Sequence, residues 1–174
     1  MAADSHLHWI ESTGGPLVVL SREVAGEWSG YAGPDYDLAC TVMDFVGIAP
    51  EDDQPRRGPV LVLGGEPMAT TYLPERHCLV RWVYANSEED LLAAVRERLD
   101  DDGAWGEGVA YDVAGPTLLL DSSAVGAEAG GDWLELDLPI GECVVKTLFF
   151  ESESSSAVLH RFTPRSGDRG PTVG

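Results

Sequence analysis

The chain has 174 residues, and its 30 Asp and Glu outnumber its 11 Lys and Arg, which gives a formal charge of −19. Hydrophobic residues make up 44% and charged residues 24%, a globular composition that excludes a disordered chain. With one lysine, Lys146, and no basic cluster beyond Arg56-Arg57, the chain has no basic stripe to neutralise phosphates, which excludes nucleic-acid binding. The negative field repels anionic lipid and attracts a basic protein, or it serves solubility alone.

Targeting and metal signals are missing from the sequence. Cys40, Cys78 and Cys143 are widely spaced and form no CxxC or Cys/His pattern, so we expect no disulfide framework, no metal and no cofactor. The start of the chain has neither the basic residues nor the apolar core of a signal peptide, and no apolar run approaches the about 20 residues that span a bilayer. We therefore expect a cytoplasmic protein that contacts neither nucleic acid nor membrane.

Taken in chain order, most of the predicted elements are strands, so the predicted fold class is mostly β (α+β). Each is rich in branched or aromatic residues and is bounded by Gly, Pro or acidic residues. The predicted strands are Trp9–Glu11, Leu17–Leu20, Phe45–Ile48, Val60–Leu63, Met68–Leu73, Cys78–Ala85, Gly108–Val113, Thr117–Leu120, Trp133–Leu138, Cys143–Phe150 and Ala157–Phe162.

Three helices are predicted among these strands. The clearest has Ser87 as its cap, acidic residues in its first turn and apolar residues at helical spacing as far as Leu99. Two shorter helices are predicted at Arg22–Trp28, with Ser21 as the cap, and at Tyr36–Met43, with Asp35 as the cap.

An internal repeat divides the chain into two related β half-units. Residues 73–88 align without gaps on residues 138–153, with Leu, Pro, Cys, Val, Ser and Glu identical. In each half a similar strand that begins with Gly-Pro, at residues 15–21 and 115–121, comes earlier in the chain. We predict a single domain over residues 9–163, with half-units at about 9–103 and 104–163 whose apolar faces pack together. Residues 1–8 are expected to be mobile and residues 164–174 to be a disordered tail.

No catalytic motif stands out. The histidines lack ligand spacing, the glycine pairs lack the lysine of a phosphate loop, and the serines lack a nucleophile elbow. The acidic clusters match no calcium loop, which leaves a solvated acidic face or a docking site for a basic partner. Trp28 lies beside glycines at the end of an element, where its ring either anchors an interface or packs in the core.

The segment His8-Trp9-Ile10-Glu11-Ser12-Thr13-Gly14-Gly15-Pro16-Leu17-Val18-Val19-Leu20 resembles the opening of the bacterial immunity protein 21 family. Further matches are Trp28-Ser29-Gly30, the Tyr-x-x-x-Cys at Tyr36 and Cys40, Thr70-Thr71-Tyr72-Leu73-Pro74-Glu75, and Val80-Arg81-Trp82. The resemblance runs from about Trp9 to Phe162 and implies a mostly β protein that is encoded beside a polymorphic toxin, binds it and blocks it. It supplies no catalytic residue, and physically Tyr36 and Cys40 indicate packing.

The resulting hypothesis is a non-enzymatic inhibitor that presents acidic surface to a cognate toxin, which is a nuclease if the carboxylates mimic nucleic acid. The stretch between the matched segments is longer in the first half (Ser21 to Leu73) than in the second (Asp121 to Leu138), which indicates an insertion in the first half. The expected contacts come from this insertion: Trp28, Asp35, Asp37, Asp44, Glu51, Asp52 and Asp53. Two alternatives remain open, namely a small enzyme that uses scattered carboxylates and a structural or regulatory protein that self-associates through its hairpin edges.

Overall fold

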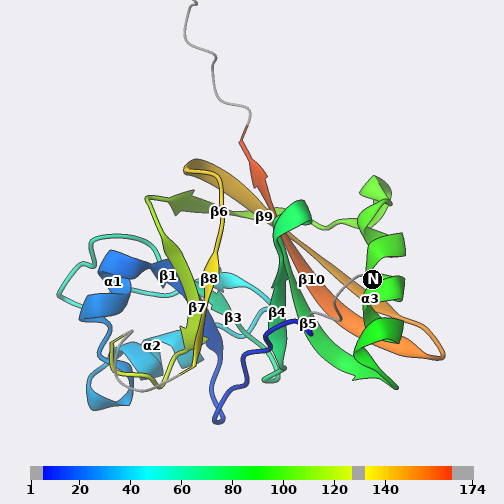
Figure 1. Ribbon diagram of the computed structural model, residues 1–174. Helices are drawn as coiled ribbons and strands as arrows, with labels where there is room; N and C mark the ends of the chain where they lie inside the picture. Colours follow the sequence, from blue (N-terminus) through cyan, green and yellow to red (C-terminus); the bar gives the residue numbers. More distant parts are fainter. Residues whose placement is uncertain (1–5, 127–131, 166–174) are drawn as a thin grey trace, which may run out of the picture.

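The computed structural model describes residues 6–126 and 132–165 (Figure 1). Two antiparallel sheets of five strands each confirm the prediction of a mostly β fold. The short sheet has the order β2 (Gly47–Ile48), β3 (Leu61–Leu63), β1 (Leu17–Ser21), β7 (Thr117–Asp121), β8 (Trp133–Leu136). The long sheet has the order β4 (Thr70–Leu73), β5 (Cys78–Ala85), β10 (Ser155–Pro164), β9 (Gly141–Glu151), β6 (Gly108–Val113).

The two sheets share one core, and helices cover their outer faces. Leu17 and Val19 of β1 point into the core between the sheets, where they join Val145 and Phe162 of the long sheet. Alternate residues of a strand face opposite sides, so Val18 of β1 points instead toward the helices. Burying both faces of β1 explains why its sequence is a continuous apolar run rather than an alternation.

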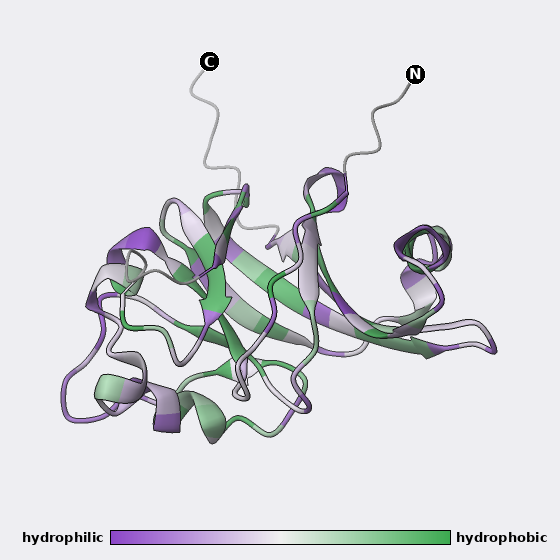
Figure 2. Ribbon diagram, turned by 60° about the horizontal axis from the view of Figure 1, so that its bottom comes forward, coloured by the Kyte–Doolittle hydropathy of each residue, from purple (hydrophilic) through white to green (hydrophobic). Residues whose placement is uncertain are grey.

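Helices α1 (Arg22–Glu27) and α2 (Asp35–Cys40) lie over the outer face of the short sheet, and α3 (Glu88–Leu99) lies against the long sheet (Figures 1 and 2). The two serine caps form as predicted. The backbone N–H of Val24 donates to Oγ of Ser21, and that of Asp90 donates to Oγ of Ser87. Both caps satisfy a backbone donor that has no partner inside its own helix.

The predicted cap of α2 is wrong. The helix begins at Asp35 itself, and Pro34 precedes it as a cap residue without a side-chain hydrogen bond. The Asp35 carboxylate turns back to Ser29 instead. Proline has no side-chain acceptor to cap the helix, but its ring fixes φ in the helical range, which suits the start of the first turn.

Several predicted strands are shorter in the structure: Val60–Leu63 begins at Leu61, Met68–Leu73 begins at Thr70, and Trp133–Leu138 ends at Leu136. Two others are reduced further. Trp9–Glu11 contributes only the isolated bridge between Ile10 and Thr70. Phe45–Ile48 is a strand only at Gly47–Ile48, because the Phe45 carbonyl is engaged by Gly64 and Arg81 outside the ladder.

The predicted half-units do not form separate layers, since each sheet takes strands from both. Strand β1 of the first half pairs with β7 of the second, and β5 and β9 flank β10 in the long sheet. The aligned residues also face different cores: Cys78 packs under α3, whereas Cys143 lies between the sheets. Duplication of the half-units therefore stays a prediction drawn from the sequence repeat.

Residues 1–5 and 166–174, to which the predicted mobile start and tail mainly belong, lie outside the described residues. Within the described part, His8 Nε2 lies 2.9 Å from the Asp132 carboxylate, and strand β10 extends to Pro164.

No helix in residues 6–126 and 132–165 is both long and apolar enough to cross a membrane.

Candidate interaction surface

Trp28, the expected anchor, lies in the core. Only 2% of the residue is exposed, and its ring packs in the cluster beneath α1 and α2. The indole Nε1–H donates to the Ser122 carbonyl at 2.9 Å, and the Arg56 guanidinium covers the ring at 5.3 Å from its centroid. The ring therefore stabilises the fold and offers almost no surface to a partner in this conformation.

Asp35 is committed to contacts within the chain. Its carboxylate accepts hydrogen bonds from the backbone N–H and the hydroxyl of Ser29, at 2.8 and 2.9 Å, and forms an ion pair with Arg56 at 3.1 Å. Partial burial raises the pKa of this carboxyl, but the hydrogen bonds from Ser29 and the Arg56 charge outweigh it and lower the pKa overall. Because Arg56 also donates to the Pro50 carbonyl, Asp35 ties the loop after Ile48 to α2.

The other five expected contact residues are exposed carboxylates: Asp37 in the first turn of α2, and Asp44, Glu51, Asp52 and Asp53 in the loops that follow. We call these five residues together the acidic loops. Two of them also shape their own loop. The backbone N–H of Gln54 donates to the Asp52 carboxylate at 2.7 Å, and that of Arg56 donates to Glu51 at 3.3 Å. These turns hold the carboxylates outward on a defined backbone.

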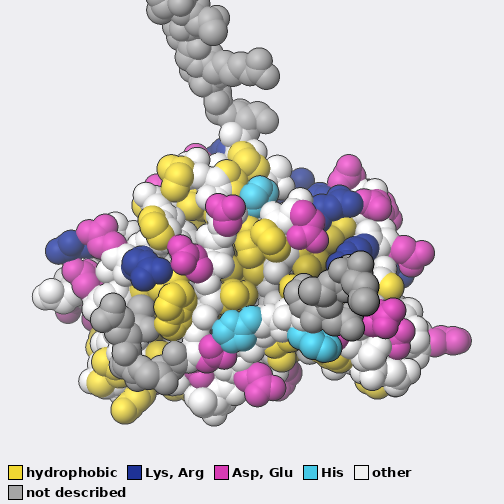
Figure 3. All heavy atoms as spheres, viewed as in Figure 1, with side chains coloured by type: hydrophobic (Ala, Val, Ile, Leu, Met, Phe, Trp, Pro, Cys, Tyr) yellow, Lys and Arg dark blue, Asp and Glu magenta, His cyan; other side chains and the backbone are white. Residues whose placement is uncertain are grey.

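Most arginines on the surface are already paired with carboxylates of the same chain, as the adjacent dark blue and magenta side chains of Figure 3 illustrate. The pairs are Arg22 with Glu135, Arg56 with Asp35, Arg57 with Glu23 and Glu27, Arg76 with Asp100, Arg161 with Asp102, and Arg165 with Glu142. None of these pairs uses a carboxylate of the acidic loops. In the part of the chain that the structure describes, the carboxylates of the acidic loops therefore form no ion pair.

Two of the motif residues hold loops in place. Gly30 has φ +51, and a Cβ there would lie 2.1 Å from the Ala124 carbonyl oxygen, so only glycine fits. Trp9 packs edge-on against Trp82 at 5.2 Å between ring centroids and donates its Nε1–H to Glu88.

Tyr36 and Cys40 lie one turn apart on α2, as the sequence predicts. Hydrogen bonding to Cys40 raises the pKa of the Tyr36 hydroxyl. The Tyr36 ring also lies against Gly15, where an added Cβ would approach the ring to 2.4 Å. The pair therefore links α2 to the Gly-Gly-Pro turn that precedes β1.

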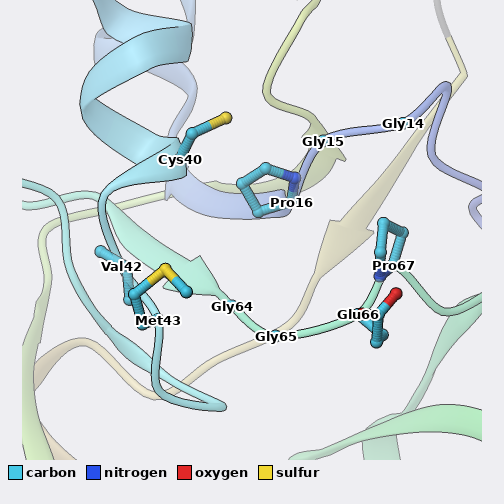
Figure 4. A pocket seen from close by; sticks show the side chains of 10 residues that line it. All are labelled: Gly14, Gly15, Pro16, Cys40, Val42, Met43, Gly64, Gly65, Glu66 and Pro67. Carbon is cyan, nitrogen blue, oxygen red and sulfur yellow. The ribbon is translucent and has the colours of Figure 1, made fainter.

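A pocket of about 380 Å³ opens beside this link (Figure 4). Its walls are residues 14–16, residues 64–67, and the chain from Cys40 to Met43. The titratable side chains in this lining are those of Cys40 and Glu66, and Figure 4 shows them on opposite walls. Acid–base or nucleophilic catalysis needs such groups within hydrogen-bond reach of one another or of one reacting atom. Across residues 6–126 and 132–165, no three His, Cys, Asp or Glu side chains are grouped as metal ligands.

A buried arginine, which sequence reasoning missed, supports the rim of this pocket. Arg81 on β5 is 1% exposed and donates to the carbonyls of Phe45, Gly64 and Glu66 at 3.0, 2.8 and 3.2 Å. Burial lowers the pKa of its guanidinium to about 10, so it is still charged at neutral pH. The three carbonyls supply the partial negative charge that a buried cation needs. The sequence signals for Arg81 were its position among apolar residues of a strand and its place in the family motif Val80-Arg81-Trp82.

An apolar patch beside the pocket was also missed. Met43 is 81% exposed, Phe45 41% and Phe149 47%. The rings of Phe45 and Phe149 stack with 6.1 Å between their centroids, although Phe45 lies between α2 and β2 and Phe149 lies on β9, over 100 positions away. Only the fold brings them together, so no local pattern indicates the patch.

Comparison with known proteins identifies the family. The model of the Immunity protein 21 family matches residues 8–156, and the chain therefore belongs to this family. Membership indicates a role in immunity to a toxin, and it confirms the resemblance seen in the sequence. Comparisons with curated proteins and with solved structures give no match.

Proposed function

We propose that this chain neutralises a cognate bacterial toxin by binding to it, without catalysis, and that the acidic loops contribute to the contact. The observation that carries the proposal is the family match over residues 8–156. The formal charge of −19 supports it, because a strongly negative inhibitor is steered toward a positively charged partner. The protein would act in the cytoplasm, beside the toxin it is encoded with.

The proposed partner is a basic toxin domain, such as a nuclease. Nucleases line their substrate channel with Lys and Arg to hold phosphates, so exposed carboxylates can occupy the same positions. Asp37, Asp44 and Glu51–Asp53 suit this role because no arginine within residues 6–126 and 132–165 forms an ion pair with them. Asp35 and Trp28 would support the loops from beneath rather than touch the toxin.

A non-catalytic mode fits the pocket, whose two titratable side chains lie on opposite walls. A binding inhibitor needs a rigid surface more than a reactive one. The ion pair of Asp35 with Arg56 supplies that rigidity by fixing the loop to α2.

The acidic loops are tested with the triple variant Glu51→Gln, Asp52→Asn, Asp53→Asn and the toxin domain encoded beside this gene. We expect the association rate at low salt to fall about tenfold and its salt dependence to weaken, since long-range steering depends on net charge near the contact. The matched control, Glu89→Gln, Glu97→Gln, Glu107→Gln, removes the same charge from exposed positions on and after α3. Equal effects of the two triple variants, or none, would refute the assignment of the loops.

A further inference from the structure

We propose that the centre of the toxin contact is the apolar patch of Met43, Phe45 and Phe149 at the edge of the pocket, and that it receives an apolar side chain of the toxin that is flanked by Lys or Arg. This proposal rests on the proposed function, because it names the place and the chemistry of the same binding event. It gives the interface an apolar centre. The sequence predicted Trp28 for that role, but Trp28 is buried.

The patch and the pocket form one continuous surface. Met43 lines the pocket, and Phe45 follows two residues later. The Phe45 ring lies against the pocket wall at Gly65, where an added Cβ would be 3.5 Å from it. The Phe45 ring also stacks on Phe149 of β9. An apolar side chain that enters the pocket would therefore also cover the two rings.

Phe149 lies on the face of β9 that points away from α3. Strands β5, β9 and β10 are the longest of the fold, and α3 packs on one face of them (Figure 2). Neighbouring Leu148 and Phe150 point into the core beneath α3, so Phe149 points to the opposite face. The Phe45 ring stacks on it there, yet 47% of Phe149 stays exposed.

The rim of the patch is acidic. Asp44 lies between Met43 and Phe45, Glu66 lines the pocket, and Glu151 follows Phe149 on the same face of β9. The segments 40–46, 64–68 and 147–151 contain no Lys or Arg. A desolvated apolar centre inside a charged rim is the usual anatomy of a protein interface, and this rim selects cations.

A buried cation, Arg81, lies beneath the patch. Arg81 is 1% exposed, and its donors go to the carbonyls of Phe45, Gly64 and Glu66. It therefore fixes the backbone on both sides of the patch before any partner arrives. A surface that is already ordered loses less conformational entropy when it binds.

Charge argues against a second copy of this chain as the occupant. Two copies that met through this patch would bring their acidic rims together, and each copy carries a formal charge of −19. A partner with Lys or Arg beside its apolar side chain gains from the same rim. The occupant is therefore a basic segment of the toxin.

The test measures the affinity of the full chain for the purified toxin domain encoded beside its gene, with the toxin inactivated. Met43→Asp and Phe149→Asp are each expected to weaken binding at least tenfold, as loss of an interface anchor does. The control Ile140→Asp places the same charge on a residue that is 71% exposed outside the patch, and it should stay within twofold of the unchanged chain. Circular dichroism and thermal melting check that each variant is folded. If Phe149→Asp does not fold, Met43→Asp still tests the patch, because Met43 is 81% exposed and its substitution leaves the core intact.

The outcomes separate this inference from the proposed function. If the unchanged chain does not bind the toxin, the proposed function fails. If it binds and Met43→Asp binds equally well, the function stands and the patch is refuted as its centre. A concentration-dependent dimer that Met43→Asp dissociates would also overturn the proposal, because it would make a second copy the occupant.

Discussion

Nη1 of Arg81 lies 3.4 Å from Nε2 of His160, and both residues are buried in the long sheet. A guanidinium can only donate, so Nε2 must accept and the ring proton belongs on Nδ1, which faces the Thr147 hydroxyl at 2.8 Å. Burial, with a further contribution from the Arg81 charge, lowers the pKa of His160 to about 3. The imidazole therefore stays neutral wherever the fold is intact near neutral pH.

This relationship predicts how stability depends on pH. Below about pH 6.5 the histidine binds a proton in the unfolded state but not in the folded state. Proton binding therefore stabilises the unfolded state, and the unfolding free energy falls as the pH is lowered toward 3. Between pH 7 and pH 5 this group should cost about 2 kcal/mol of unfolding free energy. Urea denaturation of the unchanged chain and of His160→Gln measures the effect. The loss attributable to His160 must disappear in the variant; parallel pH profiles would contradict the prediction.

Arg81 should be among the most sensitive positions of the fold. Arg81→Met removes a buried charge together with its hydrogen bonds to three carbonyls, so we expect the unfolding free energy to fall by about 3 kcal/mol or more. Arg76→Met is the control, because Arg76 is an exposed member of a surface pair with Asp100 and should cost far less. Similar losses in urea denaturation for the two variants would show that Arg81 is not the support described.

The sequence predicted those elements of secondary structure that depend on residues close together in the chain. Helix α3 was predictable because Ser87 supplies a cap and the apolar residues up to Leu99 recur at helical spacing. Most strands were predictable from branched residues between turn signals. Strand pairing was not, since the contact of β10 with both β5 and β9 depends on the whole topology.

The site was harder to predict because burial decides it. Trp28 beside glycines suggested an exposed ring, yet the packing of α1 and α2 on the short sheet encloses it. Arginines are seldom buried, so the sequence did not indicate that Arg81 lies in the interior and supports the loops around the pocket. The stacking of Phe45 on Phe149 joins distant segments, which no local pattern reports.

Gly30 should tolerate no side chain. Gly30→Ala must adopt φ +51 and place a Cβ 2.1 Å from a backbone carbonyl oxygen, so we expect a loss of about 2 to 4 kcal/mol. Gly26→Ala, in helix α1 with open space around the new Cβ, should leave stability unchanged or raise it. Thermal melting compares the two, and a tolerated Gly30→Ala would contradict the described backbone.

Asp35 and Asp37 occupy the same helix turn and should separate stability from binding. Asp35→Ala breaks the contacts with Ser29 and Arg56 and should lower the unfolding free energy by about 2 kcal/mol. Asp37→Ala should change stability little and slow toxin association at low salt, because that carboxylate is exposed. Denaturation and stopped-flow binding on both variants test this, and a reversed order of the two effects would refute it.

The most direct measurement is residual toxin activity at increasing molar ratios of this chain to a fixed amount of its cognate toxin. Neutralisation by binding predicts a titration that ends at a fixed stoichiometric ratio and reverses when the complex is dissociated. Complete loss of toxin activity at a small fraction of one equivalent would indicate an enzyme instead, and undiminished toxin activity at excess would contradict immunity by this chain.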